Sequence, residues 1–360
     1  MKWKNVLLLV VSLLVCLLLL EVIVRVALPT RLLDYRHDTE IGLRYHSDTS
    51  YQFISSFGEF DVLNRYNSHG IRGGDVDYDK DDDVFRILGM GDSFTFGYGV
   101  EEDETFISLL EGLEVDGRNV EVVNAGLSGY GPQHILRFLQ TETIQYNPDL
   151  VVVSLFIGND IVSEGSLYTL EEGELVSHQL DEASFTIKLR QWLAHRSVLY
   201  NYLYLIKFRL DVNSGKVNPY APEVYPFLKK GAELEEGFEL TQQILLEIQM
   251  YLDSKGVDVV FMVIPLKEQV DSDEMEEFRL VLEEYYEGEV DLDNVDRLHQ
   301  QLIAFFESEE IEYVDLLPVF KELDEELYFP IDAHLNANGH KAAGIVVAQH
   351  LKGIPGSVFI

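Results

Sequence analysis

From residue 84 onward, short apolar runs alternate along the chain with segments of helical periodicity. The apolar runs cover residues 84–90, 120–124, 150–156, 257–264 and 311–317. Several of them are almost wholly apolar, as strands buried on both faces of a parallel sheet are. Apolar residues recur at spacings of three and four, which is typical of helices, over residues 104–113, 133–145, 238–254, 295–308 and 338–351. This order predicts an α/β fold in which a parallel sheet of five strands is flanked by helices.

Two stretches do not follow this alternation. Residues 31–83 are rich in loop-forming residues, and we expect an extended or hairpin segment that packs on the core. Residues 163–235 interrupt the domain of residues 84–360 and include a tyrosine-rich helical pattern at 185–210. Because a structureless insertion of this length is unusual, we expect it to form a cap or a substrate-facing subdomain.

The first 30 residues predict a membrane segment. Residues 6–20 contain a single polar residue and follow two lysines, at positions 2 and 4. Glu21 and Arg25 lie four apart, a spacing at which they can pair on one helix face. No small-x-small cleavage motif follows Leu20, which favours an uncleaved transmembrane anchor over a cleaved signal peptide. The lysines favour a cytoplasmic start and arginines at 25, 31 and 36 weaken that bias, so we expect a single-pass protein whose main domain is extracytoplasmic.

Composition and charge exclude several classes of function. The chain has 63 acidic and 27 basic residues, a net charge of -36, which repels phosphate backbones and argues against nucleic acid as a partner. Its single cysteine, Cys16, lies in the apolar N-terminal run and excludes a multi-cysteine zinc site. The aspartate-rich run at 75–83 fails as a calcium loop, because Lys80 replaces the required glycine and Arg86 the required glutamate. We therefore expect neither a metal nor a cofactor.

Three loops that follow predicted strands contain glycine and polar residues. Residues 91–97 read Gly-Asp-Ser-Phe-Thr-Phe-Gly, which puts Ser93 at a strand end just before a helix. Residues 124–131 read Asn-Ala-Gly-Leu-Ser-Gly-Tyr-Gly, and residues 158–160 read Gly-Asn-Asp. Taken alone, Ser93 is explained as well by helix capping and Asn159 by turn formation.

A fourth polar segment, Asp-Ala-His over residues 332–334, precedes the last predicted helix. In an extended segment, residues two apart face the same side, so Asp332 can hold the imidazole of His334 in the tautomer that accepts a proton. Asp332 is equally explained as a surface acid of an acidic protein.

The four segments together support a stronger interpretation than any one of them. In open parallel sheets, ligands gather at the carboxyl ends of the strands, where these loops are expected to meet. There they supply a nucleophile, a base, an orienting acid and donors for an oxyanion, which is the set that acyl transfer requires. No Gly-x-Ser-x-Gly surrounds Ser93, so the nucleophile elbow of the lipase type is not indicated.

These segments resemble the four blocks of the SGNH hydrolases, the GDSL-like esterases and lipases, whose blocks centre on serine, glycine, asparagine and histidine. The resemblance spans residues 84–350 apart from the insertion. It implies a three-layer α/β/α sandwich with a flavodoxin-like, five-stranded parallel sheet. It also implies Ser93 as nucleophile, His334 as general base, and Ser93, Gly129 and Asn159 as the oxyanion hole.

One position departs from the family pattern. The commonest arrangement places the aspartate three residues before the histidine, whereas Asp332 lies two before His334. Asp332 is therefore expected as the third triad member, with a backbone carbonyl as the alternative partner of the imidazole.

The resemblance implies an ester hydrolase that works through an acyl-serine intermediate. Residues 60–100 also resemble the front of SGNH proteins of bacterial surface-polysaccharide systems, in a segment that reads Asn-Ser-His-Gly-Ile-Arg-Gly over 67–73. We therefore expect an ester or O-acylated small molecule or glycan as substrate. Two alternatives stay open: an O-acyltransferase that uses the same residues, and a non-catalytic component of envelope assembly.

Overall fold

A computed structural model describes residues 2–27, 35–38, 41–55, 57–160, 168–171, 174–177, 189, 192–193, 196–214, 232–285 and 291–352. The chain divides into two compact units. One consists of Met1–Arg36 and Leu180–Pro219, and the other of His37–Gln179 and Tyr220–Ile360. The segments expected to contain the functional residues all belong to the second unit.

The described strands are β1 (Tyr35–Asp38), β2 (Gly42–Tyr45), β3 (Thr49–Ile54), β4 (Asp61–Tyr66), β5 (Val84–Met90), β6 (Glu114–Val115), β7 (Arg118–Asn124), β8 (Leu150–Phe156), β9 (Tyr168–Glu171), β10 (Glu174–Ser177), β11 (Asp258–Ile264) and β12 (Tyr313–Asp315). The α-helices are α1 (Lys2–Ala27), α2 (Ser93–Phe96), α3 (Pro132–Thr141), α5 (Val198–Asn213), α6 (Ala232–Lys255), α7 (Lys267–Val270), α8 (Ser272–Tyr285), α9 (Asp293–Ser308), α10 (Leu317–Glu322) and α11 (Ala337–Leu351). Short 3₁₀ turns lie at Glu102–Glu104, Ser108–Leu110 and Thr143–Tyr146.

The central sheet has the strand order β12-β11-β8-β5-β7-β6. Strands β5, β7, β8, β11 and β12 pair in parallel, in the flavodoxin-like order that the family resemblance implies. All seven residues of β8 are buried, which explains why this strand reads as an unbroken apolar run. The prediction misses a sixth strand, because β6 is only two residues long and pairs antiparallel at the edge beside β7.

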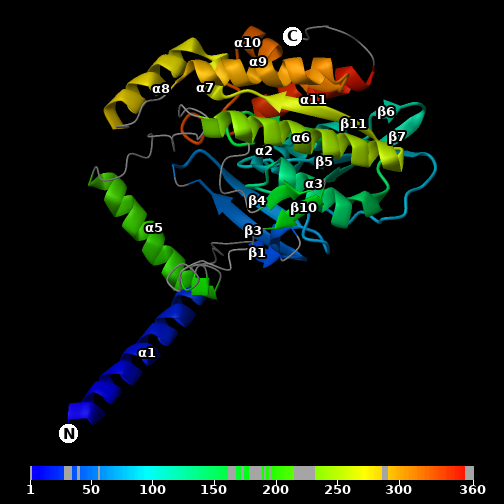
Figure 1. The fold of residues 1–360 in the computed structure, drawn as a ribbon. Helices are drawn as coiled ribbons and strands as arrows, with labels where there is room; N and C mark the ends of the chain where they lie inside the picture. The colour runs from blue at the N-terminus through cyan, green and yellow to red at the C-terminus, as the bar shows by residue number, and fades with distance from the viewer. Residues whose placement is uncertain are drawn as a thin grey trace. The chain divides into compact units, whose positions relative to one another are not determined.

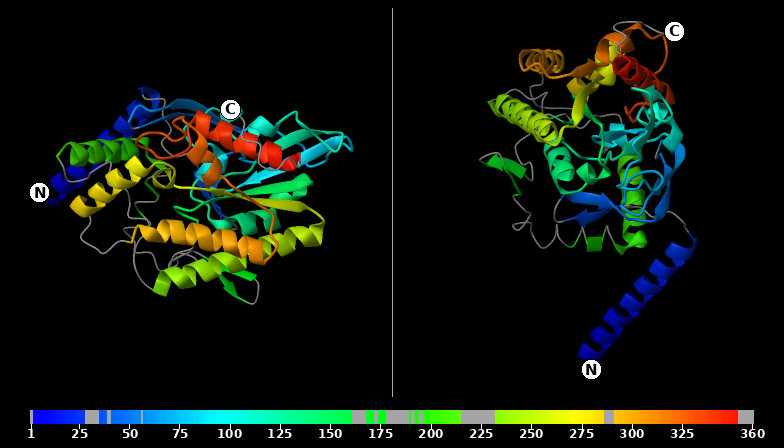
Figure 2. Two further views of the ribbon diagram at one scale, coloured as in Figure 1. Left: turned by 90° about the horizontal axis from the view of Figure 1, so that it is seen from above. Right: turned by 90° about the vertical axis from the view of Figure 1, so that its right-hand side faces the viewer.

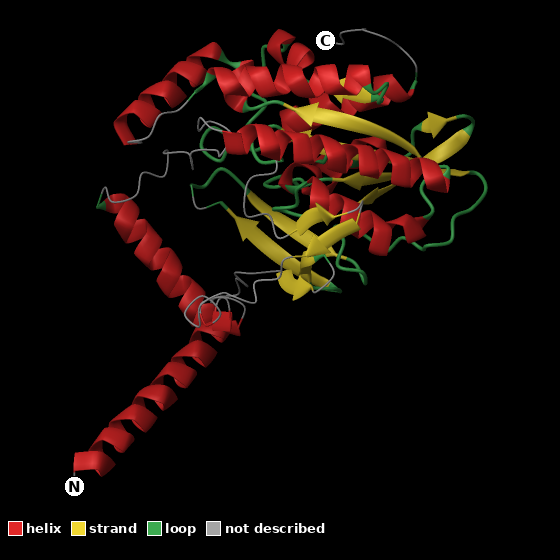
Figure 3. Ribbon diagram, in the orientation of Figure 1, coloured by secondary structure: helices red, strands yellow, loops and turns green. Residues whose placement is uncertain are grey.

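Helices cover both faces of this sheet (Figures 1 and 3). In the view from above, α11 lies on one side of the strands, and α6 and α9 lie on the other (Figure 2). The buried faces of these helices supply fully enclosed side chains, among them Leu245, Leu298 and Val347. The three-layer α/β/α arrangement that the resemblance implies is therefore confirmed.

The expected helix at residues 104–113 is wrong. Two 3₁₀ turns occupy this region, at Glu102–Glu104 and Ser108–Leu110. The amide of Phe106, which a continuous helix would bond to residue 102, instead donates to Nδ1 of the buried His340 in α11 (3.2 Å). Phe106, Ile107 and Leu110 are all buried, so their spacing reflects packing against α11 and the sheet rather than an α-helix.

Other helix and strand predictions differ mainly at their ends. The last predicted strand, 311–317, shortens to β12 (Tyr313–Asp315), and the helix predicted at 238–254 lengthens to α6 (Ala232–Lys255). Helix α8 (Ser272–Tyr285) is absent from the prediction, because charged residues interrupt its apolar pattern. Of the insertion at 163–235, the structure describes β9, β10 and α5, and much of the remainder lies outside the described residues.

Within the first unit, α1 and α5 are joined by polar contacts of Glu21. Its carboxylate accepts hydrogen bonds from the Ser197 hydroxyl (2.7 Å) and from the amides of Val198 and Leu199 (3.0 Å each), so it caps the start of α5. Arg25 Nε donates to Glu21 Oε1 (2.6 Å), the pair that their spacing predicts. The helix predicted at 185–210 is interrupted at Ser197, and part of it lies outside the described residues.

Candidate active site

The nucleophile candidate Ser93 opens the four-residue helix α2, directly after β5. Asp92 precedes it as the helix cap, and its carboxylate accepts the amide hydrogen of Phe94 (2.9 Å). Gly91 has φ near +158°, and an added Cβ would lie 2.3 Å from the hydroxyls of both Thr95 and Ser154. The turn is therefore closely packed, and Ser93 is 7% exposed.

His334 joins Ser93 to Asp332. His334 Nε2 lies 2.8 Å from Ser93 Oγ, and Nδ1 is hydrogen-bonded to Asp332 Oδ1. The structure therefore brings together three residues that lie up to 241 positions apart in the chain. A neutral imidazole that donates from Nδ1 to the carboxylate presents Nε2 as an acceptor toward the serine hydroxyl.

The expected contact between Asp332 and His334 is present, but the expectation of an extended backbone between them is wrong. The segment is not extended: Ala333 has φ +64°, in the left-handed region that residues other than glycine seldom adopt. This reversal of the backbone lets the side chains of Asp332 and His334, which lie two residues apart, form a hydrogen bond with each other. The turn at Ala333 therefore allows Asp332 to contact His334, although Asp332 is one position closer to the histidine than in the commonest family pattern.

Two aromatic rings pack against the imidazole of His334. Tyr98 stacks on His334 with ring centroids 4.3 Å apart, and the Phe94 ring centroid lies 4.8 Å away. Burial raises the pKa of the Tyr98 hydroxyl, so Tyr98 stays neutral beside the imidazole. The rings restrict rotation of His334 and keep Nε2 directed at Ser93.

Asn159 lies beside the nucleophile turn, at the end of β8. Its side-chain amide donates to Asp92 Oδ2 (2.9 Å), and an amide nitrogen carries a second hydrogen that can be donated to another acceptor. Asp92 is completely buried, and Asp160 behind it is 3% exposed. Burial raises the pKa of both carboxyl groups, and that of Asp160 is raised further by the charge of Asp92.

The loop that contains Gly129 is attached to the nucleophile turn. The amide of Leu127 donates to Gly91 O (3.0 Å), and an added Cβ on Gly126 would lie 2.2 Å from Phe96 N. Gly129 has φ +82°, which favours glycine, and a Cβ added there would meet nothing within 4 Å. The structure therefore anchors this loop through Gly126 and Leu127, with Gly129 two residues further on.

Several residues around Ser93 and His334 are not predicted from the sequence. A cap at Asp92 could have been expected from an aspartate just before a helix start. Nothing in the local sequence indicates that Tyr98 stacks on His334, or that Arg72 and Tyr45 reach this region, because these contacts join segments that are distant in the chain.

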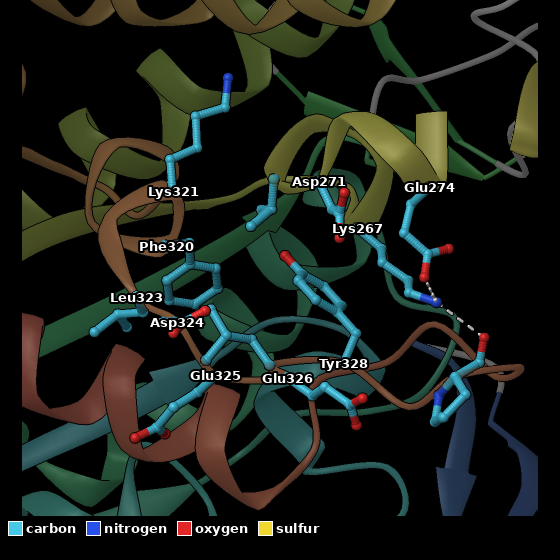
Figure 4. A pocket seen from close by; sticks show the side chains of 13 residues that line it. Lys267, Asp271, Glu274, Phe320, Lys321, Leu323, Asp324, Glu325, Glu326 and Tyr328 are labelled. Carbon is cyan, nitrogen blue, oxygen red and sulfur yellow. Dashed lines mark hydrogen bonds and ion pairs between the residues drawn. The ribbon is translucent and has the colours of Figure 1, made fainter. Parts of the chain in front are cut away.

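A separate cavity of about 460 Å³ lies beside the segment that leads to Asp332 (Figure 4). Lys267 lies on its wall, where its ammonium contacts Glu274 (2.8 Å) and donates to Pro330 O (3.0 Å). None of the predicted site residues lines this cavity. The cavity therefore contributes to the site indirectly, because Lys267 on its wall holds the backbone at Pro330, two residues before Asp332.

Across the described parts of the chain, no group of three or more His, Cys, Asp or Glu side chains is arranged to hold a metal ion. The candidate site contains a hydroxyl, an imidazole and a carboxylate in a hydrogen-bonded series, beside an amide donor and a loop that contains glycine. Such a set can deprotonate the hydroxyl as it attacks a carbonyl carbon, and it can stabilise the negative oxygen that results.

Three solved structures illustrate what the chain is similar to. The acetylxylan esterase Axe2 from Geobacillus stearothermophilus, a catalytic mutant, has 12% identity and a TM-score of 0.40, covering 74% of this chain and 94% of that chain. The lipase/acylhydrolase from Enterococcus faecalis has 17% identity and a TM-score of 0.37, covering 75% and 96%. A member of the lipolytic protein G-D-S-L family from Veillonella parvula has 16% identity and a TM-score of 0.38, covering 74% and 97%.

Comparison of the sequence with curated proteins found no match. In contrast, the model of the GDSL-like lipase/acylhydrolase family matches residues 90–342, which is well over half of the chain and includes Ser93, Asn159 and His334. The chain therefore belongs to the GDSL-like lipase/acylhydrolase family and is an ester hydrolase.

Proposed function

We propose that this protein is a membrane-anchored serine esterase that removes O-acyl groups, with Ser93 as nucleophile, His334 as general base and Asp332 as the orienting acid. The observation that carries the proposal is the hydrogen-bonded series in which His334 Nε2 lies 2.8 Å from Ser93 Oγ and Nδ1 contacts Asp332. A serine that merely caps a helix needs neither an imidazole partner nor a carboxylate behind it.

In this mechanism, Ser93 Oγ attacks the ester carbonyl carbon while His334 Nε2 takes the hydroxyl proton. The carbonyl π electrons move to oxygen, and the backbone amides of Ser93 and Gly129 and the side-chain amide of Asn159 stabilise that oxyanion. Collapse of the tetrahedral intermediate expels the alcohol, which receives the proton from His334 and leaves an acyl-Ser93 ester. Water then repeats the sequence, with His334 as base, and releases the carboxylic acid.

The substrate class we propose is an O-acylated glycan. Support comes from segment 67–73, which resembles the corresponding segment of SGNH proteins in bacterial surface-polysaccharide systems. An acidic protein of net charge -36 suits a neutral acylated sugar better than a phosphorylated or otherwise anionic ester.

We propose that α1 anchors the protein in a membrane as a single span, with the second unit on the extracytoplasmic side. Helix Trp3–Ala27 contains an 18-residue window with a mean hydropathy of 3.2, and it is the one helix in the described part of the chain long and apolar enough to cross a bilayer. Carbonate extraction of membranes and a reporter fused at the C-terminus test insertion and orientation. Release of the protein by carbonate, or a cytoplasmic reporter signal, would overturn this part of the proposal.

The esterase proposal is tested with the full chain in mild detergent. Separate samples of wild type and Ser93→Ala are either treated with a fluorophosphonate probe or, without the probe, assayed with aryl acetate and butyrate. Serine-dependent labelling together with ester turnover is the expected result. A folded wild type that neither labels nor hydrolyses would contradict the proposal and favour an assembly component, whereas acyl transfer to an added glycan in preference to water would indicate an acyltransferase.

Replacing Asn159 by Ala removes the proposed side-chain oxyanion donor. We expect kcat to fall about 100-fold or more with little change in KM, because the donor acts mainly on charge that develops in the transition state. Steady-state kinetics and circular dichroism check the effect. Asn338→Ala, at an exposed asparagine in the first turn of α11, serves as the control and should retain full activity.

A further inference from the structure

Arg72 lies on a segment outside the region matched by the family model, yet it reaches the nucleophile turn. Its Nη1 donates to the carbonyl oxygens of Phe96 and Gly97, and its Nη2 donates to Val100 O, each at 2.6 Å. The guanidinium also lies over the Phe96 ring, 4.8 Å from its centroid. Arg72 is 3% exposed, so a buried cation is held almost entirely by backbone carbonyls of the turn that follows Ser93.

The turn needs such a partner because α2 ends after a single turn. The amides of Gly97 and Tyr98 both donate to Ser93 O (3.0 Å each), and Gly97 takes a left-handed φ of +85° that stops the helix. The carbonyls of the last residues then have no helical partners, and they form the negative end of the helix. Arg72 satisfies these carbonyls with donors that carry a positive charge.

The polar segment 67–73 folds into a turn that places Arg72 at the nucleophile turn. The side chain of Asn67 accepts from the amides of His69 (2.9 Å) and Ile71 (3.0 Å), and it donates to Gly74 O (3.1 Å). Gly70 takes φ +71°, and an added Cβ would lie 2.5 Å from Tyr45 O. The Asn-x-x-Gly pattern thus builds a tight reversal that presents the next arginine to the core.

The same segment is attached to the loop that contains Gly129. The backbone of Arg72 forms an antiparallel bridge with Asn124, whose side chain accepts from the amide of Gly126 (3.1 Å). Tyr45 Oη lies 3.0 Å from Ser128 Oγ, and it accepts from the amide of Ser128 (3.4 Å), directly before Gly129. Residues of one N-terminal segment therefore contact both the nucleophile turn and the proposed oxyanion loop.

We propose that Arg72 is a positioning residue that fixes the turn of Ser93 relative to the loop of Gly129, and that Tyr45 assists it at Ser128. The inference rests on the proposed serine esterase function, because it assigns a role within that site. It makes Tyr45 and Arg72 part of the framework of the active site, although neither of them touches the reacting atoms. Lysine is not an equivalent replacement, since one ammonium lacks the planar fork that reaches three carbonyls at once.

The test compares Arg72→Ala, Arg72→Lys and Tyr45→Phe with wild type as full chains in detergent. Ester turnover and the rate of fluorophosphonate labelling of Ser93 are measured beside circular dichroism and thermal unfolding. We expect Arg72→Ala to lose about 100-fold in kcat with KM changed less than about threefold, because a displacement near 1 Å is enough for such a loss. Tyr45→Phe, which removes only a hydroxyl, should lose about two- to tenfold.

Chemical rescue separates positioning from general destabilisation. Arg72 also lines a cavity of about 660 Å³, through which a small solute can reach the vacated space. Guanidinium at non-denaturing concentration should restore kcat of Arg72→Ala at least severalfold, while ammonium should not and wild type should gain nothing. Arg65→Ala, at an exposed arginine on the preceding strand β4, is the matched control and should behave as wild type.

The outcomes distinguish this inference from the function on which it rests. A wild type without labelling or turnover means that the esterase proposal has failed. An active wild type beside a folded Arg72→Ala with unchanged kcat overturns the role of Arg72. If Arg72→Ala does not fold, Arg72→Lys decides: wild-type kcat in that variant overturns the inference, and a reduced kcat in a folded variant supports it.

Discussion

At Ala333 the backbone takes φ +64°, and this one residue sets the geometry between Asp332 and His334. A non-glycine residue pays about 1 kcal/mol or more for that conformation. We expect Ala333→Gly to keep activity and to unfold at the same or a slightly higher denaturant concentration. Ala333→Val should lower kcat/KM at least tenfold, because a β-branched residue disfavours the turn more strongly. Equal activity in the Gly and Val variants would show that the turn does not matter.

Asp160 is a buried carboxyl group with one unsatisfied oxygen. Its Oδ2 accepts from the Phe156 amide (2.7 Å), whereas Oδ1 has no hydrogen-bond partner. Asp92 accepts from two donors, so Asp160 is the member of the pair that is held neutral. Its pKa is raised above the unfolded value of 3.8, so its contribution to stability is present below that pH and is lost as pH rises through the folded pKa.

Replacing Asp160 by Asn should therefore stabilise the protein increasingly as pH rises. Near pH 4 the variant and wild type should unfold at similar urea concentrations. By pH 8 we expect the free energy of unfolding of Asp160→Asn to be higher by on the order of 1 kcal/mol, since the amide carries no charge to bury. Urea titrations at both pH values make the comparison, and a difference that does not depend on pH would refute a neutral Asp160.

At the scale of elements, α2 and the loop after β7 approach so closely that only glycine fits at position 126. A Cβ there would lie 2.2 Å from Phe96 N and 2.6 Å from Thr95 C, both backbone atoms. Gly126→Ala should separate the loop from the nucleophile turn, lower kcat about 100-fold and reduce stability by about 1–3 kcal/mol. Gly74→Ala is the matched control, because its Cβ would meet nothing within 4 Å. Kinetics and thermal unfolding of both variants provide the check.

At the scale of the whole molecule, the burial of neutral histidines makes the free energy of unfolding depend on pH in the acidic range. Burial lowers the pKa of His340 from 6.5 to about 3, and its Nδ1 accepts from the Phe106 amide. The depressed pKa means that the unfolded chain binds a proton that the folded chain excludes. The stabilising contribution is thus present above pH 6.5 and is lost as pH falls toward 3, by at most about 1.4 kcal/mol per pH unit.

The His340→Asn variant tests this linkage. Asparagine offers an acceptor to Phe106 but does not titrate, so its unfolding free energy should fall less steeply than that of wild type between pH 6.5 and 4. Chemical denaturation at several pH values in this range gives both slopes. Parallel curves for the two proteins would exclude His340 as a source of acid sensitivity.

The sequence by itself determined the elements whose signals are local. Strands β5, β8 and β11 are buried on both faces and read as apolar runs, and α9 and α11 show the three-to-four spacing of helices with one buried face. Because parallel strands end at one edge, their order also predicted that Ser93 and His334 would meet, which they do at 2.8 Å.

Only the tertiary structure decided the contacts that join distant segments. The Phe106 amide leaves the helical pattern because His340, 234 residues away, offers an acceptor. Arg72 donates to the carbonyl oxygens of Phe96 and Gly97, which the one-turn helix α2 leaves without helical partners. The left-handed Ala333 is likewise imposed by its surroundings, since alanine has no local preference for that conformation. Local periodicity reports burial, whereas the partner of each buried polar group depends on which segments pack together.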